Sequence, residues 1–164
     1  MTGHRPVLVE SALFRSVFRR HAAGVTIVTA QGAHPVGFTA TSLASLSVNP
    51  PLLTFGISAT ASSWPVVNAA RHVGVHFLGE EQETLAATFA RSGVDRFAAP
   101  ASWHQGPEGV PVLDGVLALL ICRVVSRVAA GDHTLVIAEP VHAQQGKEGQ
   151  PLLYHDGGYA TLRT

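Results

Sequence analysis

Short runs rich in β-branched and aromatic residues follow one another along most of this chain, with turn residues between them. They occupy residues 24–30, 36–42, 51–57, 72–78, 115–130, 133–145 and 158–162. Runs of this kind, joined by tight turns, are typical of antiparallel β-structure. A doubly wound parallel sheet would need regular strand–helix alternation, which the sequence lacks. We therefore expect a mainly β fold, an antiparallel barrel with a few short flanking helices.

Three short segments carry helical patterns. Residues 10–20 place Leu13, Phe14, Val17 and Phe18 on one face. Residues 62–70 form a helical turn that Ser62 or Ser63 can cap and that Pro65 suits at its start. Residues 80–90 begin with acidic side chains, as the N-terminal end of a helix favours.

Two connections between these elements stand out. The sequence "AGDH" at 130–133 predicts a hairpin turn, because Gly and Asp tolerate turn dihedrals. Residues 91–111 hold three prolines and three glycines and read as a long loop. Loops of this length in compact domains tend to be functional. We expect Trp103 and His104 either to cover a site or to anchor the loop.

Composition limits the classes of function. The 164 residues suit one domain, residues 1–164, with residues 1–9 as a flexible N-terminal arm. Charged residues make up 13%, about half the usual share, so a subunit interface or a ligand is expected to cover part of the surface. With 11 basic and 11 acidic residues and no basic stripe, nucleic-acid binding is not expected.

The cysteine count, the N-terminus and the apolar stretches indicate the cellular compartment. The single cysteine, Cys122, cannot form an internal disulfide. The N-terminus lacks a basic-then-apolar leader pattern, and the longest uncharged apolar stretch, 116–122, is too short to span a bilayer. We expect a cytoplasmic protein without membrane contact.

Common cofactor motifs are absent from the sequence. It contains no GxGxxG, no GxxxxGK[ST] and no GxSxG pattern. The nine histidines are scattered, and His72 and His76 share a strand face without a third ligand, so no metal site is expected.

The segment "GFTATSLASLSVNPP", residues 37–51, is uncharged and rich in hydroxyl groups although it lies between two strand patterns. A second polar cluster, Ser58 to Ser63, follows the next strand. Hydroxyls and free backbone amides can hold a phosphate, and a planar heterocycle needs such groups at its edges and apolar walls on its faces. The residues alone leave open that these hydroxyls make only ordinary backbone bonds.

The order of segments resembles the flavin reductase family with an FMN-binding split barrel, the reductase components of two-component flavin monooxygenases. Five stretches carry the resemblance over nearly the whole chain: "FRRHAAGVTIVTA", "GFTATSLASLSVNPPLLTFGI", "HVGVHFLGEEQETLAATFA", "GDHTLVIAEPV" and "PLLYHDGGY". The resemblance implies a split β-barrel of Greek-key type. It also implies a homodimer with flavin sites near the subunit interface.

The resemblance assigns roles to residues of this chain. The isoalloxazine ring would be lined mainly by backbone groups of Thr39, Ala40, Thr41, Ser42, Ser45, Leu46 and Ser47, with N–H groups of 45–47 near the reacting edge. Ser58, Ser62 and Ser63 would meet the flavin phosphate, and Phe89 would pack or contact flavin. His133 would lie at the nicotinamide as the residue that holds its amide or ribose.

Two departures from the family pattern concern basic and amide side chains. Many relatives carry a basic residue beside the phosphate stretch, whereas "SATASSWP" has none, and the nearest are Arg71, Arg91 and Arg96. The choice between FMN and FAD therefore stays open. His76 stands where relatives commonly have Asn.

The function that the resemblance implies is an NAD(P)H:flavin oxidoreductase. It would transfer hydride from NADH or NADPH to FMN, with FAD possible, and supply reduced flavin to a partner monooxygenase. One alternative is a non-catalytic split barrel that binds flavin or haem. Another is an accessory protein whose main role is contact with an oxygenase.

Overall fold

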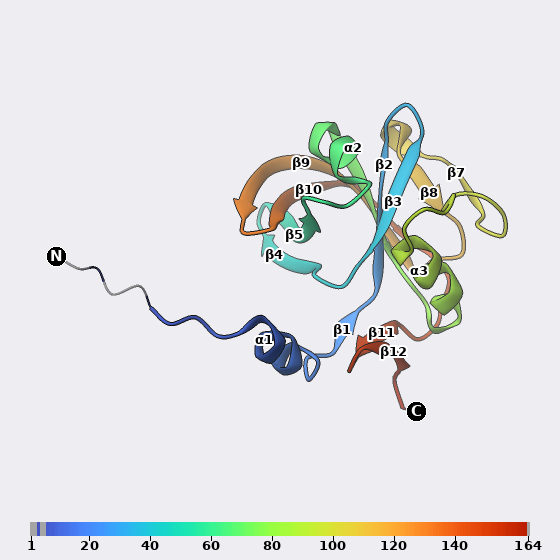
Figure 1. The fold of residues 1–164 in the computed structure, drawn as a ribbon. Coiled ribbons are helices and arrows are strands. Elements are labelled where there is room, and N and C mark those ends of the chain that lie inside the picture. Colours follow the sequence, from blue (N-terminus) through green and yellow to red (C-terminus); the bar gives the residue numbers. More distant parts are fainter. Residues whose placement is uncertain (1–2, 4–5, 164) are drawn as a thin grey trace.

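The computed structural model describes residues 3 and 6–163 and is built mainly from antiparallel strands (Figure 1). Its helices are α1 (Ser11–Phe18), α2 (Trp64–Ala69) and α3 (Glu83–Ala90), with 3-10 turns η1 (Glu80–Gln82) and η2 (Pro107–Gly109). Its strands are β1 (Ala23–Gly24), β2 (Thr26–Gln31), β3 (Pro35–Ala40), β4 (Ala44–Val48), β5 (Pro51–Ser58), β6 (His72–Phe77), β7 (Trp103–Gln105), β8 (Pro111–Leu113), β9 (Ala118–Ala130), β10 (His133–Gln145), β11 (Leu152–His155) and β12 (Gly158–Thr161).

The main sheet has seven strands in the order β3-β2-β6-β9-β10-β5-β4, and all its neighbours are antiparallel. The sheet curls so that β3, at one edge, contacts β5, next to the other edge, although no hydrogen-bonded ladder joins the two. An antiparallel barrel that approaches closure without completing it is a split barrel. The predicted mainly β architecture is confirmed.

The core lies inside this curled sheet. Strand β5 alternates so that Leu53, Phe55 and Ile57 are buried, as period-two patterning requires of a strand with one buried face. A second apolar cluster surrounds Phe89 of α3, which is fully buried against β2 and β3. This cluster fixes α3 over one side of the barrel, so the end of α3 is held beside the first residues after β3.

The predicted turn at "AGDH" is confirmed as the tip of the long β9–β10 hairpin. Ala130 pairs with His133, so the connection is two residues, Gly131 and Asp132. Gly131 has φ +63°, a conformation that glycine adopts without steric cost. The turn therefore ends both strands at one point and projects His133 from the barrel rim.

Several strands lie where the sequence pattern predicted loops or other boundaries. The strand predicted at 36–42 ends at Ala40, and β4 follows within the hydroxyl-rich segment. Part of the predicted loop 91–111 is ordered as the β7–β8 hairpin and η2. The small sheet β1-β11-β12 was predicted only at its last strand.

Helix α1 lies apart from the main sheet, beside β1 (Figure 1). The predicted apolar face is present, but none of its residues is buried, and Leu13, Phe14, Val17 and Phe18 are each more than half exposed. Before it, residues 6–10 are exposed and carry no regular structure, while residues 1, 2, 4 and 5 of the predicted arm lie outside the described part. Among the described residues, no helix is long and apolar enough to span a membrane.

Candidate active site

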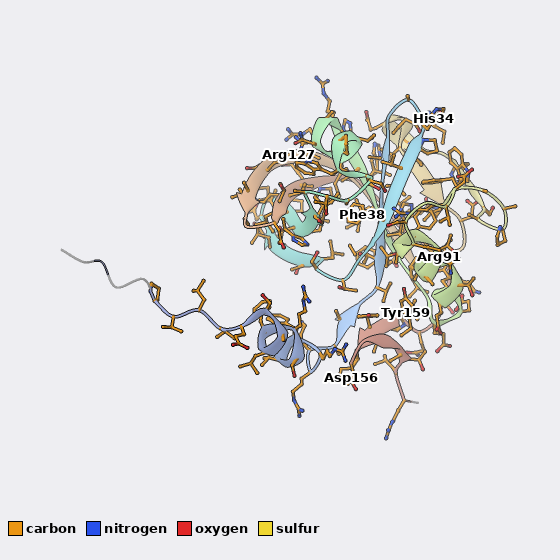
Figure 2. All side chains as sticks on the ribbon, viewed as in Figure 1. His34, Phe38, Arg91, Arg127, Asp156 and Tyr159 are labelled. Carbon is orange, nitrogen blue, oxygen red and sulfur yellow. The ribbon has the colours of Figure 1, made fainter. Side chains whose placement is uncertain are left out.

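A cleft of about 410 Å³ opens at the barrel rim where four segments meet. It lies between the end of β3, the end of β5 with the turn after it, the end of α3 with the following loop, and the tip of the β9–β10 hairpin. Figure 2 labels Phe38 of β3, which lines it, near the centre of the molecule.

The structure brings most of the predicted site residues to this cleft. Its lining includes Thr39, Ala40, Thr41, Ser42, Ser58, Ser62, Phe89 and His133. The two hydroxyl-rich clusters thus share one rim, although a whole strand separates them in the sequence.

Four predicted residues do not line the cleft. Ser45, Leu46 and Ser47 belong to β4, where Ser45 and Ser47 pair with β5 and a bulge leaves Leu46 between them, 55% exposed. The hydroxyl of Ser63 is buried and donates to the carbonyl of Gly37 at 3.2 Å. The predicted cap by Ser63 is wrong, since its side chain makes no capping bond to α2.

The bend after β3 has unused backbone donors, and two of its residues, Thr41 and Ser42, line the cleft. The N–H groups of Thr41, Ser42 and Leu43 have no acceptor among the described residues. The neighbouring side chains are committed to structure: the Thr39 hydroxyl donates to Ala86 O at 2.6 Å, and Ser42 Oγ accepts the Gly56 N–H at 2.9 Å. These bonds hold the bend while leaving its amides free for a ligand acceptor.

The turn after β5 offers a second set of donors. Ser58 Oγ lies 3.0 Å from Thr60 Oγ1, and this contact closes the turn. Within residues 6–163 the N–H groups of Ser62 and Ser63 have no acceptor, and the Ser62 hydroxyl is exposed and unbonded. Successive free amides beside a hydroxyl form a concavity suited to an anion.

Arg96 supplies the only formal charge among the described lining residues, and in the sequence it is one of the three basic residues nearest to the phosphate stretch. Its guanidinium donates to Gly37 O at 2.5 Å and to Arg91 O at 3.0 and 3.1 Å, which leaves further N–H groups free. Partial burial lowers the pKa of Arg96. Its position in the loop after α3 is the only sequence feature that could have indicated this role.

Aromatic side chains support the cleft from beneath. The space over Gly37 is closed by Phe89, since a Cβ there would lie 2.8 Å from the Phe89 ring. Phe89 stacks edge-to-face on Phe97, and Phe97 does the same on Trp103. Trp103 therefore anchors the loop indirectly, through Phe97 and Phe89, and does not itself line the cleft.

His133 stands at the rim with about half of its side chain exposed. Its Nδ1–H donates to the Asp132 carboxylate at 2.7 Å, so Nε2 is the ring nitrogen left for a ligand. The hydrogen bond and charge of His133 lower the pKa of Asp132. Gly56 lies beneath, and its missing side chain leaves the space between His133 and Ser42 open.

This arrangement fits a flavin. The ring system needs apolar faces and polar edges, and the cleft offers Phe38 and Ile57 with the free amides of the bend after β3. The phosphate needs donors, which the turn after β5 and Arg96 provide. An uncharged wall around the ring avoids the desolvation that ionised side chains would suffer.

Residues 18–163 match the protein family described as flavin reductase like domain. The chain belongs to this family. The match covers most of the described structure, including every element that lines the cleft.

Named relatives and solved structures agree with this assignment. The chain is 46% identical to an NADH:FMN oxidoreductase of Rhodococcus qingshengii over 89% of this chain and 79% of that protein. It is 40% identical to the reductase component of a 4-nitrophenol monooxygenase of Rhodococcus opacus, covering 92% and 80%. A flavin reductase domain protein of Arthrobacter superimposes with a TM-score of 0.90 at 42% identity, covering 94% and 97%.

One further solved structure holds ligands. The NADH:FAD oxidoreductase of Streptomyces globisporus, in complex with NAD and FAD fragments, has a TM-score of 0.89 at 31% identity and covers 96% of this chain and 98% of that one. Flavin and nicotinamide therefore bind a protein of this fold.

Proposed function

We propose that this protein is an NADH-dependent flavin reductase that transfers hydride from NADH to FMN. The observation that carries the proposal is the meeting of two hydroxyl- and amide-rich turns, 41–42 and 58–62, on one cleft whose only formal charge among the described residues is Arg96. Relatives named as an NADH:FMN oxidoreductase and as an FMN reductase (NADH) support the choice of donor and acceptor.

The flavin, when bound, supplies the group that accepts hydride. The chain positions the reactants. Amides 41–43 hold the polar edge of the ring and stabilise the negative charge that builds there during transfer. Phe89 and Gly37 fix the cleft wall, and His133 holds the nicotinamide amide or ribose through Nε2. Orientation and exclusion of water then account for the rate, and no side chain acts as a nucleophile.

The phosphate-binding groups favour FMN as the flavin. Arg96, Ser58 and Ser62 all line the cleft, and we assign them to a single phosphate monoester. FAD would place its second phosphate and adenosine beyond this set. A relative of this fold is named as using FAD, so the two flavins are to be compared directly.

The proposal extends to partners. Relatives named as monooxygenase reductase components support a monooxygenase that receives the reduced flavin. The exposed apolar face of α1 supports a homodimer. We place this reaction in the cytoplasm, as expected from the sequence.

The test is NADH consumption, followed at 340 nm, by purified protein with FMN, FAD or riboflavin added in turn. Rapid oxidation that depends on added flavin, with FMN preferred over riboflavin, is the expected result. The test variant is Gly56→Val, whose side chain would fill the cleft between Ser42 and His133. It should abolish flavin binding while the barrel stays folded. Flavin binding without any oxidation of NADH or NADPH would indicate a binding protein and overturn the proposal.

A further inference from the structure

A second cavity, of about 600 Å³, adjoins the cleft, and the reaction described so far makes no use of it. It lies between α1, the bend 41–44 and the β11–β12 hairpin. Thr41 and Ser42 line both the cavity and the cleft, so the two spaces meet at this bend. A molecule seated at the ring edge of the cleft can therefore extend into the cavity.

Three aromatic side chains line this cavity. Phe14 and Phe18 face it from α1, with their ring centroids 4.8 Å apart, and Tyr154 faces it from β11. Tyr154 is held edge-to-face on Tyr159, which Figure 2 labels, so its orientation is fixed. Aromatic faces of this kind can stack on any nucleobase, because stacking does not depend on the hydrogen-bonding groups at the edges of the base.

The cavity also carries net positive charge. Arg15 and Arg19 line it together with one carboxylate, Asp156. The turn at Asp156 and Gly157 packs on the end of α1: the Asp156 N–H donates to Arg19 O at 3.0 Å, and the Arg19 guanidinium lies against Gly157. Gly157, at φ +76°, gives that guanidinium its place without a side chain in the way.

Arg15 links the cavity to the nicotinamide end of the cleft. The pKa of Asp132 is lowered mainly by its hydrogen bond to His133, and the nearby charge of Arg15 lowers it further. Arg15 therefore stands within electrostatic reach of the hairpin tip that carries His133. A donor held at His133 therefore has the Arg15 guanidinium within electrostatic reach, and Arg15 lines the cavity.

We propose that this cavity binds the adenosine diphosphate end of NADH, with Arg15 and Arg19 on the pyrophosphate and the aromatic walls on the adenine. The inference rests on the proposed function and assigns a subsite for its hydride donor. FAD carries the same adenosine diphosphate group. The donor is favoured, because the flavin phosphate is assigned to residues 58–62 and Arg96, none of which lines this cavity.

The kinetic test compares NADH with dihydronicotinamide riboside, which delivers the same hydride but lacks both phosphates and adenosine. Arg15→Gln should lower kcat/KM for NADH about tenfold and leave the value for the riboside within twofold. Arg20→Gln removes the same charge from the turn just after α1, at a residue that does not line the cavity, and should change neither value. An equal loss with both donors, or no loss with NADH, would overturn the proposal.

A binding test needs no turnover. ADP-ribose titrated into flavin-free protein by calorimetry should bind, and Arg15→Gln should weaken this binding about tenfold while Arg20→Gln does not. Absence of ADP-ribose binding to the wild type would refute the subsite. If Arg15→Gln instead weakens FAD and spares FMN, and leaves the advantage of NADH over the riboside intact, the cavity serves the flavin and the proposal is wrong. If the wild type oxidises neither donor, the proposed function itself fails.

Discussion

At the scale of single residues, His76 shows how a buried polar side chain can be fully satisfied. It lies on β6 with no exposed surface, its Nδ1–H donates to Ile27 O and its Nε2 accepts the Leu113 N–H, both at 3.0 Å. Both bonds require the neutral ring. The ring thus ties the barrel to β8, which gives a physical reason for histidine at this position.

The neutral state of His76 makes stability depend on pH. Burial lowers its pKa from 6.5 to about 4, against a smaller opposing effect of the bond to Ile27. Between these values the unfolded chain binds a proton that the folded chain does not, so stability is lost as pH falls from 6.5 towards 4. The slope attributable to His76 should approach about 1.4 kcal/mol per pH unit.

Urea unfolding at several pH values between 4 and 7.5 measures this slope. The comparison is His76→Asn, which should be less stable near pH 7 by about 1–3 kcal/mol because it fills the space less well. Its stability should fall less steeply below pH 6.5, since the titrating ring is gone. Parallel profiles of variant and wild type would show that other groups cause the acid sensitivity.

His133 is predicted to act through binding of the nicotinamide. His133→Ala should raise KM for NADH roughly threefold to tenfold, the value of one hydrogen bond, and leave the Kd for FMN unchanged. His34→Ala is the matched control, because His34 lies exposed at the β2–β3 turn and outside the cleft (Figure 2). A change confined to FMN affinity in steady-state and binding measurements would count against this role.

Ser63 is an example of a hydrogen bond that local residue patterns do not predict. A serine before a short helix predicts a cap or a phosphate ligand, whereas its hydroxyl bonds Gly37 O, 26 residues earlier. Arg96 reaches the same carbonyl from 59 residues later. Partners at such separations depend on how α2, β3 and the loop after α3 pack together, which local sequence does not record.

At the scale of elements, the buried strands were readable from the sequence and the exposed ones were not. Strands β2, β5, β6, β9 and β10 alternate or bury continuous β-branched runs. Strand β4 buries none of its residues and pairs with β5 at the sheet edge, so no apolar alternation reveals it. Its hydroxyls indicated a ligand loop where the structure has an edge strand.

The β11–β12 hairpin carried a turn signal in the sequence. Asp156 and Gly157 are its two turn residues, and both have positive φ, 51° and 76°. An Asp-Gly pair between two short strand patterns is typical of this turn. Both strands of the hairpin are only four residues long, and the strand pattern predicted residues 158–162 but missed β11.

The loop after α3 is an element whose function can be tested through Arg96. Arg96→Gln should weaken FMN binding about tenfold or more, because a charge-assisted bond to the phosphate is lost, and should leave riboflavin binding unchanged. Arg91→Gln is the control: the carbonyl of Arg91 accepts bonds from Arg96, and its side chain lies outside the cleft lining (Figure 2). Fluorescence titration of both flavins measures the effect. Equal losses for FMN and riboflavin would mean that Arg96 only holds Gly37 and the loop.

At the scale of the whole molecule, α1 is an eight-residue helix without a single buried residue. Isolated helices of this length are marginal in water, so packing must supply their stability. Phe14 and Phe18 face the second cavity, whereas Leu13 and Val17 do not line it and point their apolar surface elsewhere. In the proposed homodimer, a second copy of the chain covers this face with its own sparsely charged surface.

The dimer contact is therefore predicted to include Leu13 and Val17. Light scattering should give the wild type a mass of about twice 17.2 kDa at micromolar concentration, and Leu13→Glu with Val17→Glu should shift it toward a single chain. Val94→Glu changes an exposed apolar residue of the loop after α3 in the same way and should leave the mass unchanged. Circular dichroism verifies that each variant keeps its β-structure.

Separation of the chains should also impair the site. Thr41 and Ser42 line both the cavity beside α1 and the flavin cleft, so we expect loosening of α1, a wall of the cavity, to disturb the cleft through this bend. We expect the Leu13→Glu, Val17→Glu variant to bind FMN several-fold more weakly and to lose more activity with NADH than with dihydronicotinamide riboside. A wild type that is monomeric at tens of micromolar would refute the homodimer, and a variant that dimerises equally well would place the interface elsewhere. Either result would leave α1 as a wall of the donor cavity alone.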